Sequence, residues 1–388
     1  MVNNQFDISV INTLPLRLQE QWDALQPDNF PFGHFHFLLG LEQAGCVGKL
    51  SGWEPRYVLV QEKKSNRLIA VLPMYGKSHS YGEYIFDMEW AHFAAQQGYV
   101  YYPKLVVAIP YTPATGQRIF IQDSKESQLI ISELVSFIKT YAHENHYSSI
   151  HFLFLKKEEA QLLNEQKFLI RHSSQYHFKN QGYKTFSDYL ATLRSQKRKH
   201  IKRERNSVRD QGIEIQILEG SDITESHMEL MFQFYATTTM EKMGQQYLNE
   251  EFYKYLGLYF KSYMVVIFAV LEGEPVGGSL FFKKSNKLFG RYWGSSKYIP
   301  YLHFEMCYYQ GIEYCIKNKL TYFEAGAQGE HKFLRGFEPV TTFSAHWFCN
   351  SDLQRTFSNF CHREKKMIKQ NMDWLKTISP QKDLRVRA

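Results

Sequence analysis

The sequence predicts a mixed α/β fold in which one module occurs twice, and three observations support this prediction. Residues 56–77 and 264–284 are apolar, β-rich runs, each interrupted by a short polar turn, which is the pattern of a β-hairpin. Helical periodicity precedes each hairpin, and a long helical segment and another apolar strand follow it. The length of 388 residues suits two domains, because a domain usually holds about 100–200 residues. We therefore expect one module over residues 1–183 and a second over 184–388; the alternative is two unrelated hairpins in one α/β protein.

The expected elements follow the same order in both halves. In the first half we expect helices near 16–25 and 35–44, a hairpin turn at 63–66, a helix near 126–144 and a strand at 150–155. In the second half the corresponding ranges are 226–243, 250–260, 272–275, 303–318 and 321–324. Residues 185–211 predict one or two helices that open the second module, and a C-terminal helix is expected near 353–374.

The positive charge of the chain is concentrated in one segment. The chain holds 46 Lys and Arg against 39 Asp and Glu, a net charge of +7. Eight of these bases lie between Arg194 and Arg209 with Glu204 as the only acid, so this segment accounts for the whole surplus. A generally basic protein, in which charge is spread along the chain, is therefore excluded. What remains is a neutral globular body with one basic helix.

That basic helix has a docking stripe and an outward face. Leu190, Leu193, Ile201 and Val208 fall on one narrow apolar stripe. Five bases share another face at three- and four-residue spacing: Arg194, Arg198, Lys202, Arg205 and Arg209. Like charges at this spacing repel, so we expect them to bind the phosphates of a polyanion. The alternative is a solvated face neutralised by acids from elsewhere in the chain.

Targeting and metal signals are not evident in the sequence. The first ten residues lack a basic start and an apolar run, and the most apolar stretch, 264–271, is far shorter than a membrane span. Five scattered cysteines suggest neither a disulfide framework nor a zinc ribbon, so a cytoplasmic location is expected. The histidines lack completing ligands for a metal, and no nucleophile-elbow string indicates a hydrolase.

Several long strings in the chain resemble a known family. In the second half they are FGRYWG at 289–294, LHFEMCYYQGI at 302–312 and EAGAQGEHKFLRGFEP at 324–339. In the first half they are residues 79–87, 101–105 and 110–113. Together with the basic run, they resemble the bacterial FemAB-like family of predicted N-acyltransferases, described as peptidoglycan biosynthesis/recognition proteins, over about residues 53–380. The resemblance implies two tandem GNAT-like modules.

The resemblance also implies a reaction. Fem-type enzymes move an aminoacyl group from aminoacyl-tRNA to the peptide amine of a cell-wall precursor. Their C-terminal signature corresponds here to residues 332–337, but Leu334 replaces the usual lysine, whose charge Lys332 or Arg335 could supply. The regions 294–300 and 110–116 lack the glycine-rich spacing with which acyl-CoA enzymes hold a pyrophosphate. This favours aminoacyl-tRNA over acyl-CoA as the donor co-substrate, and no tightly bound cofactor is expected.

The predicted function is therefore N-acyl transfer from a phosphate-rich donor, aminoacyl-tRNA or acyl-CoA, to a small-molecule or peptide amine. The acceptor could be a cell-wall precursor, with peripheral membrane contact where that precursor is lipid-linked. The alternative is a non-catalytic protein on a GNAT scaffold that binds tRNA or RNA, or recognises the cell wall or an anionic membrane.

Candidate site residues gather in a glycine-bounded loop. Gly326 and Gly329 permit close approach of a ligand to the backbone. The predicted catalytic residues are Glu330, His331, Lys332 and Arg335, with Glu330 or His331 as general base. The predicted substrate-binding residues are Tyr81, Glu83, Lys104, Arg291, Tyr292, His303, Glu305 and Gln328. Several of these residues also have a structural alternative: a surface cap for Glu330 and His331, an ion-pair partner for Arg291 and a structural histidine for His303. Glu305 could be a helix-start acid, and the segment 79–87, whose polar residues alternate as in a strand, could lie at a sheet edge.

Overall fold

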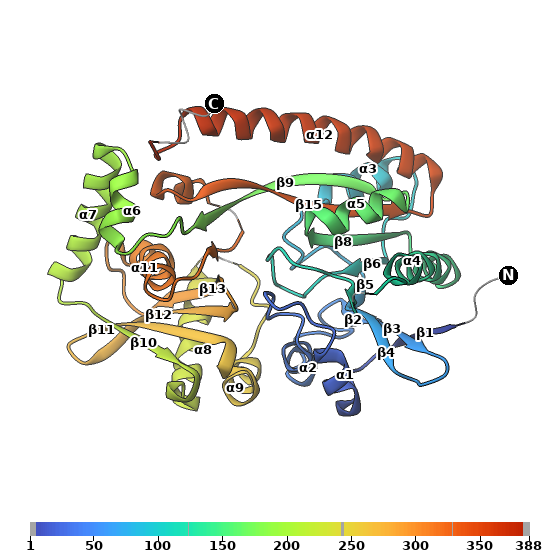
Figure 1. Ribbon diagram of the computed structural model, residues 1–388, viewed down its shortest axis with the longest axis horizontal. Helices are drawn as coiled ribbons and strands as arrows, with labels where there is room; N and C mark the ends of the chain where they lie inside the picture. The colour runs from blue at the N-terminus through green and yellow to red at the C-terminus, as the bar shows by residue number, and fades with distance from the viewer. Residues whose placement is uncertain (1–4, 123, 242–243, 328, 383–388) are drawn as a thin grey trace. The chain divides into compact units, whose positions relative to one another are not determined.

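The structure is a computed structural model that describes residues 5–122, 124–241, 244–327 and 329–382 (Figure 1). The chain forms two compact units, Met1–Ser173 with Thr341–Ile368 and Ser174–Val340 with Lys369–Ala388. It passes from the first unit to the second within β9 (Leu169–Lys179), and returns within β15 (Glu338–Phe348). The C-terminal helix α12 (Ser351–Thr377) begins in the first unit and ends in the second. The division into repeated modules at 183/184 stays a prediction.

The first unit contains two groups of paired strands. One group has the order β1-β3-β4-β7, and all its pairs are antiparallel. In the other, β2, β5 and β6 are antiparallel neighbours, β6 is parallel to β8, and β8 is antiparallel to β15. The strands are β1 (Phe6–Ile11), β2 (Trp53–Pro55), β3 (Tyr57–Glu62), β4 (Leu68–Leu72), β5 (Met74–Lys77), β6 (Lys104–Val107), β7 (Phe120–Ile121) and β8 (Ser149–Leu155). The helices are η1 (Leu16–Leu18), α1 (Gln19–Asp23), α2 (Phe35–Gln43), α3 (Met88–Gln96), α4 (Ser127–Glu144) and α5 (Lys157–Glu165).

The second unit begins with two helices and continues into one twisted meander. The strands β10 to β13 are antiparallel neighbours, β13 is parallel to β14, and β14 is antiparallel to the end of β9. The strands are β10 (Glu214–Glu219), β11 (Met264–Leu271), β12 (Glu274–Lys284), β13 (Lys287–Ser295) and β14 (Tyr322–Glu324). The helices are α6 (Phe186–Thr192), α7 (Ser195–Asp210), η2 (Gly220–Asp222), α8 (Glu225–Glu241), α9 (Glu250–Tyr259), η3 (Lys261–Tyr263), α10 (Leu302–Phe304), α11 (Gln310–Lys317) and η5 (Glu330–Arg335). A π-helical turn, η4 (Glu305–Tyr309), joins α10 to α11.

The predicted mixed α/β class is confirmed, and the repeated order of elements is visible in the strand pairing. In the second unit, the helices α8 and α9 precede the hairpin β11–β12, and α11 connects β13 to the parallel strand β14. In the first unit, α1 and α2 precede the hairpin β3–β4, and α4 lies between the parallel strands β6 and β8. A helix between two parallel strands is the connection that parallel pairing requires.

The predicted helical segment 185–211 forms two helices. The first begins with a capping box, because the Thr185 hydroxyl accepts from the Asp188 backbone and the Asp188 carboxylate accepts from the Thr185 backbone. Leu193 and Arg194 are extended between the helices, and they pair with residues 380–382 through the Arg194 N–H to Pro380 and a bridge to Gln381. This pairing explains why one helix does not run through the whole segment.

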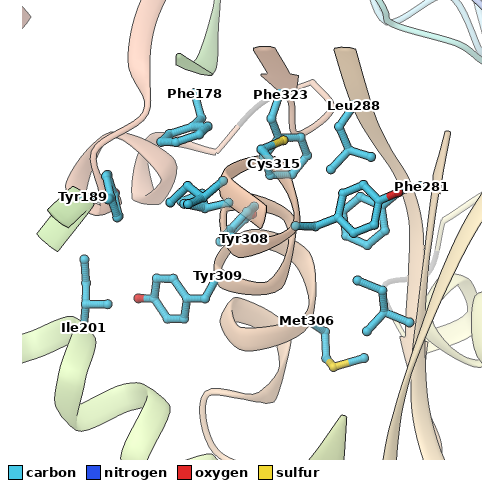
Figure 2. Close-up of a cluster of buried hydrophobic side chains, with 14 of the residues drawn as sticks. Phe178, Tyr189, Ile201, Phe281, Leu288, Met306, Tyr308, Tyr309, Cys315 and Phe323 are labelled. Carbon is cyan, nitrogen blue, oxygen red and sulfur yellow. The ribbon is translucent and has the colours of Figure 1, made fainter. Parts of the chain in front are cut away.

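The docking stripe predicted for the basic helix is buried as expected. Leu190, Leu193, Ile201 and Val208 join the hydrophobic core of the second unit. Figure 2 shows Ile201 of α7 and Tyr189 of α6 on the same side of this core as Tyr309, whose hydroxyl points toward α7. Burying each such side chain contributes roughly 1.5–3 kcal/mol, so the helix is firmly attached and its opposite face is presented to solvent.

One local prediction is wrong. The segment 79–87 is a loop and not the alternating strand that its polar residues suggested. Gly82 and Tyr84 have positive φ angles of 79° and 60°, which an extended strand does not permit. In the described part of the chain, no helix is long and apolar enough to cross a bilayer.

Candidate functional site

The loop that follows β14 carries the predicted catalytic residues. Gly326 and Gly329 have φ angles of 83° and 98°, so both positions need the conformational freedom of glycine. They bring the chain into the short helix η5, on which Lys332, Phe333 and Arg335 are buried and Glu330 is exposed. The predicted Gln328 lies outside the described residues. The loop thus presents an exposed carboxylate beside two buried cations.

Arg335 is held by the basic helix. Its Nη2 donates to Glu204 Oε1 at 2.6 Å, its Nε donates to Glu204 Oε2 at 3.2 Å and to the Tyr309 hydroxyl at 2.9 Å. The guanidinium lies 3.5 Å over the Phe304 ring. Tyr309 also donates to Glu204, and His200 Nε2 lies 2.8 Å from Glu204 Oε1. Arg335 is therefore held in place by Glu204 and Tyr309, and its predicted catalytic role stays a prediction.

Lys332 is the second buried cation of the loop. Its Nζ donates to the carbonyl oxygens of Gly326 at 2.8 Å and Ala327 at 3.3 Å, which leaves one of its three protons for another acceptor. The pKa of Lys332 is lowered to about 8, mainly because the side chain is buried. Cys307 raises this pKa and Arg291 lowers it further. A lysine in this state donates a hydrogen bond at neutral pH and loses its charge in mild alkali.

His331 lies in an aromatic cluster formed by η4 and its neighbours. Its Nε2 is 2.8 Å from the Tyr308 hydroxyl. The rings of His303, Phe304 and Tyr308 lie 6.1, 5.9 and 5.6 Å from its ring. Trp293 of β13 extends the cluster through a contact of 5.6 Å with His303. The structure thus brings the predicted residues His303 and His331 together, at a π-helical turn, a feature frequent at functional sites.

The remaining predicted residues of β13 lie next to this cluster. Arg291 acts electrostatically on Lys332, and its guanidinium lies 5.3 Å from the ring centre of Tyr292. Tyr292 packs against Tyr235 of α8 at 5.4 Å and Tyr253 of α9 at 6.0 Å. Arg291 therefore belongs with the loop, whereas Tyr292 contributes to the packing of the helices on the sheet.

The outward face of α7 is only partly neutralised. Within residues 5–122, 124–241, 244–327 and 329–382, no carboxylate forms an ion pair with Arg194, Arg198 or Lys202. Arg209 is highly exposed and lies 3.9 Å from Asp210. The hollow beside this face has a volume of about 610 Å³ and is lined by Lys199, Lys202, Arg203, Asn206, Ser207, Asp210 and Gln211. Most of the predicted phosphate-binding face is therefore free of internal counter-charges.

Arg205 differs from its neighbours on α7. Its Nη2 donates to Glu305 at 2.8 Å and to Glu313 at 2.7 Å, and its Nε donates to Glu305 at 3.1 Å. Burial lowers the pKa of Arg205, but the two carboxylates outweigh it and raise the pKa above its usual value. Arg205 and Glu305, predicted as separate ligand contacts, are thus each other's partners, because α7 packs on the start of the helix that carries Glu305. The ligand contacts predicted for both residues stay predictions.

The predicted Lys104 and Glu83 belong to a buried cluster in the first unit. Lys104 Nζ donates to Ser80 at 2.8 Å, Glu83 at 2.9 Å and Asp87 at 2.5 Å, so all three of its protons are used. It is also fully buried, and the ligand contact predicted for it stays a prediction. Burial raises the pKa of Glu83 to about 7, against the lowering effect of Lys104. Only Tyr81 of the three predicted residues has an exposed side chain, while its carbonyl accepts from Lys77 at 3.0 Å.

Several polar residues of these clusters escaped the sequence reasoning. Burial lowers the pKa of Lys77 to about 7, and the pair His151–His346 joins two strands through Nδ1 atoms 2.6 Å apart. No short motif links them, since His151 and His346 are 195 positions apart. Glu204 did carry a signal, because it is the only acid in the basic segment and falls on the side of the docking stripe. Among the described residues, no group of three or more His, Cys, Asp or Glu is arranged to hold a metal ion.

Solved structures share this fold at low sequence identity. FemX is 10% identical with a TM-score of 0.53, and the match covers 88% of this chain and 98% of FemX. A conserved protein of unknown function from Bacteroides thetaiotaomicron is 12% identical with a TM-score of 0.52, covering 88% and 99% of the two chains. L-PGS from Bacillus licheniformis is 13% identical with a TM-score of 0.49, covering 82% and 94%. The first two matches show a common fold.

The sequence itself matches a family over nearly its whole length. No curated protein matches the chain significantly. Residues 16–383 match the FemAB-like family, described as peptidoglycan biosynthesis/recognition. This range contains the basic helix α7, the loop of Lys332 and the buried cluster around Lys104. The chain belongs to the FemAB-like family of peptidoglycan biosynthesis/recognition proteins.

Proposed function

We propose that the protein is an N-acyltransferase that moves an acyl or aminoacyl group from a phosphate-rich donor to an amine. One observation carries the proposal: the cationic face of α7 is joined by the buried Glu204–Arg335 ion pair to the loop that holds His331 and Lys332. Membership of the FemAB-like family and a fold shared with FemX support a transferase. The donor's phosphates bind on α7, and the acceptor, an amine of a cell-wall precursor, reaches the loop.

The reaction needs a polarised carbonyl and an acceptor for one proton. The amine nitrogen attacks the carbonyl carbon of the donor, and the bond from that carbon to the donor's oxygen or sulfur breaks with its electron pair. Lys332 donates its remaining proton in a hydrogen bond to the carbonyl oxygen as negative charge develops there. We assign the acceptance of the amine's proton to His331, whose Nε2 lies 2.8 Å from the Tyr308 hydroxyl.

The donor is an aminoacyl-tRNA or an acyl-CoA, since both carry phosphates next to an activated acyl group. The unneutralised bases on α7 favour the longer polyanion, because several phosphates then contact the helix at once. Both donors belong in one assay.

A reconstituted transfer assay tests the proposal. The full chain is incubated with aminoacyl-tRNA or acyl-CoA and a panel of cell-wall precursor amines, and products are identified by mass spectrometry. Lys332→Met should lower kcat by about 100-fold, because one donor to the oxyanion is lost. Leu334→Ala is the matched control, since Leu334 lies on the same helix but is exposed, and it should retain full activity. Full activity of Lys332→Met would refute its assigned role.

The face of α7 also favours a second candidate, an RNA-binding protein without catalysis. Such a protein would bind tRNA with a steep dependence on salt, about 0.9 in logarithmic slope for each phosphate contact on a duplex. The two candidates differ in one result, because only the transferase turns over an aminoacyl-tRNA. Binding without any transfer across the amine panel would select the second.

A further inference from the structure

A second hollow beside α7 contains none of the groups assigned to the chemical step. It has a volume of about 400 Å³ and lies within the second unit. Its apolar lining comes from α6, α7, β10 and the residue before β10: Phe186, Leu190, Val208, Ile213 and Ile215. Exposed Lys202, Asn206 and Arg209 of α7 line it as well. An apolar hollow with cations at its edge suits a ligand that joins a flat or apolar part to an anion.

The planar guanidinium of Arg205 is held in a fixed orientation in this hollow. It lies 4.4 Å from the ring centre of Phe186. Glu305 holds its Nε and Nη2 at 3.1 and 2.8 Å, and Glu313 holds Nη2 at 2.7 Å. Gln310 also donates to Glu305 at 2.7 Å, so both oxygens of that carboxylate accept hydrogen bonds. A guanidinium fixed in this way does not swing out to a phosphate, but its flat face suits stacking against a planar ring.

The cations next to Arg205 are available to phosphates. Lys202 and Asn206 line both this hollow and the one of about 610 Å³ that also includes Lys199 and Arg203. In the part of the chain that the structure describes, no carboxylate forms an ion pair with Lys199, Lys202 or Arg203. A planar ring placed on Arg205 would thus lie in the hollow that shares Lys202 and Asn206 with the neighbouring cationic hollow.

We propose that the hollow binds the base of a nucleoside phosphate whose phosphates lie on Lys199, Lys202 and Arg203. The inference deepens the proposed function and rests on it for the phosphate contacts. The shared chemistry, a base joined to phosphates, has two sources among the proposed donors, which are coenzyme A and the nucleotides of a transfer RNA. Arg205 then recognises the donor by stacking, whereas its lysine and arginine neighbours hold the charge.

Calorimetric titration of the full chain with two probes tests this. Adenosine 3′,5′-bisphosphate should bind about tenfold more tightly than inorganic pyrophosphate, because stacking of one base adds this much affinity. Arg205→Lys keeps a positive charge near Glu305 but removes the planar guanidinium. It should therefore abolish the preference for the bisphosphate over pyrophosphate and leave the pyrophosphate affinity within about twofold of wild type. Equal binding of both probes to the wild type, or an unchanged preference in Arg205→Lys, would overturn the proposal.

A second variant keeps the test valid if Arg205→Lys does not fold. Asn206→Leu reduces the volume of the hollow from an exposed position, and it should also remove the preference for the nucleotide. Gln196→Leu is the matched control, because Gln196 is exposed on the same helix and lines neither hollow. A preference that survives Asn206→Leu, or that falls equally in Gln196→Leu, would contradict the assignment.

Competition with coenzyme A and with transfer RNA separates the two sources. Displacement of the labelled bisphosphate by one of them supports the proposal and identifies the donor class, and displacement by neither overturns it. The outcome is independent of catalysis. Loss of the nucleotide preference with acyl transfer intact overturns only the base-binding site, whereas an intact preference without transfer overturns only the proposed function.

Discussion

At Glu204, one buried carboxylate accepts hydrogen bonds from Arg335 and Tyr309 and lies against His200. It is the only acid of the basic segment, and it is buried while four of the eight bases are exposed and the other four are half-buried. Its negative charge is therefore paired with Arg335 of the loop and does not neutralise the bases on the outward face of α7. One residue thus serves both the attachment of α7 and the order of the predicted catalytic loop.

Replacing Glu204 tests this role. Glu204→Ala leaves the Arg335 guanidinium buried without its counter-charge, which should lower the free energy of unfolding by about 3–5 kcal/mol in urea titrations. The double variant with Arg335→Met should lose less than the sum of the two single variants, because the uncompensated charge is gone. A loss below about 1 kcal/mol in Glu204→Ala would show that the ion pair is unimportant.

Lys332 gives the site a dependence on pH. Because burial lowers its pKa to about 8, the charged form is lost as pH rises through that value, and we propose that this form donates to the substrate carbonyl. The rate of transfer, kcat, should therefore fall on the alkaline side of pH 8. Lys332→Arg should move this fall to higher pH, because arginine stays charged. An unchanged alkaline limb in Lys332→Arg would mean that another group titrates there.

At the scale of the element, α7 divides its bases between two tasks. Arg205 is tied to Glu305 and Glu313, while Arg198 and Lys202 have no carboxylate partner among the described residues. From the sequence, all three bases were predicted to lie on one phosphate-binding face, because three- and four-residue spacing shows only which side of a helix residues share. It does not show which carboxylates pack against that side. The partner, Glu305, lies 100 positions away along the chain.

The salt dependence of tRNA binding separates the two tasks. Arg198→Ala and Lys202→Ala should each reduce the logarithmic salt slope by about one, because each removes one phosphate contact. Arg205→Ala should leave that slope unchanged and lower the stability of the protein instead, because it removes the partner of a buried Glu305. Equal slopes for all three variants and the wild type would contradict phosphate binding by α7.

At the scale of the whole molecule, much of the element order could be predicted and most of the side-chain partnerships could not. Strong periodicity gave the helix expected at 250–260, found as α9, and the strand expected at 150–155, found as β8. The strand predicted for the segment 79–87 is wrong. Its polar residues alternate as in a strand, but Gly82 and Tyr84 have positive φ angles that turn the chain. The Glu204–Arg335 pair spans 131 positions, and no local pattern predicts a contact at that separation.

The stability of the protein should fall in mild acid through the His151–His346 pair. Burial holds the pKa of both histidines well below the usual value, so they stay neutral in the folded state. The unfolded chain binds protons near the ordinary histidine pKa of about 6.5, so the stability contributed above that pH is lost as the pH falls. Buried Glu83 acts in the opposite sense, because its raised pKa of about 7 favours the folded state at low pH.

A difference measurement isolates the two histidines from Glu83. Urea unfolding of the wild type and of the double variant His151→Gln/His346→Gln should be compared between about pH 7.5 and 5.5. The wild type should lose stability relative to the variant as the pH falls. A difference that does not change with pH would mean that the pair is not neutral in the folded protein.

We propose that the cations of α7 hold the donor whose acyl group reacts at the loop of Lys332. The most direct test is steady-state transfer by the double variant Arg198→Ala/Lys202→Ala with varied donor concentration. The donor KM should rise about tenfold or more while kcat stays close to the wild-type value, because phosphate contacts bind the donor without entering the chemical step. An unchanged donor KM, with full transfer activity, would contradict the account.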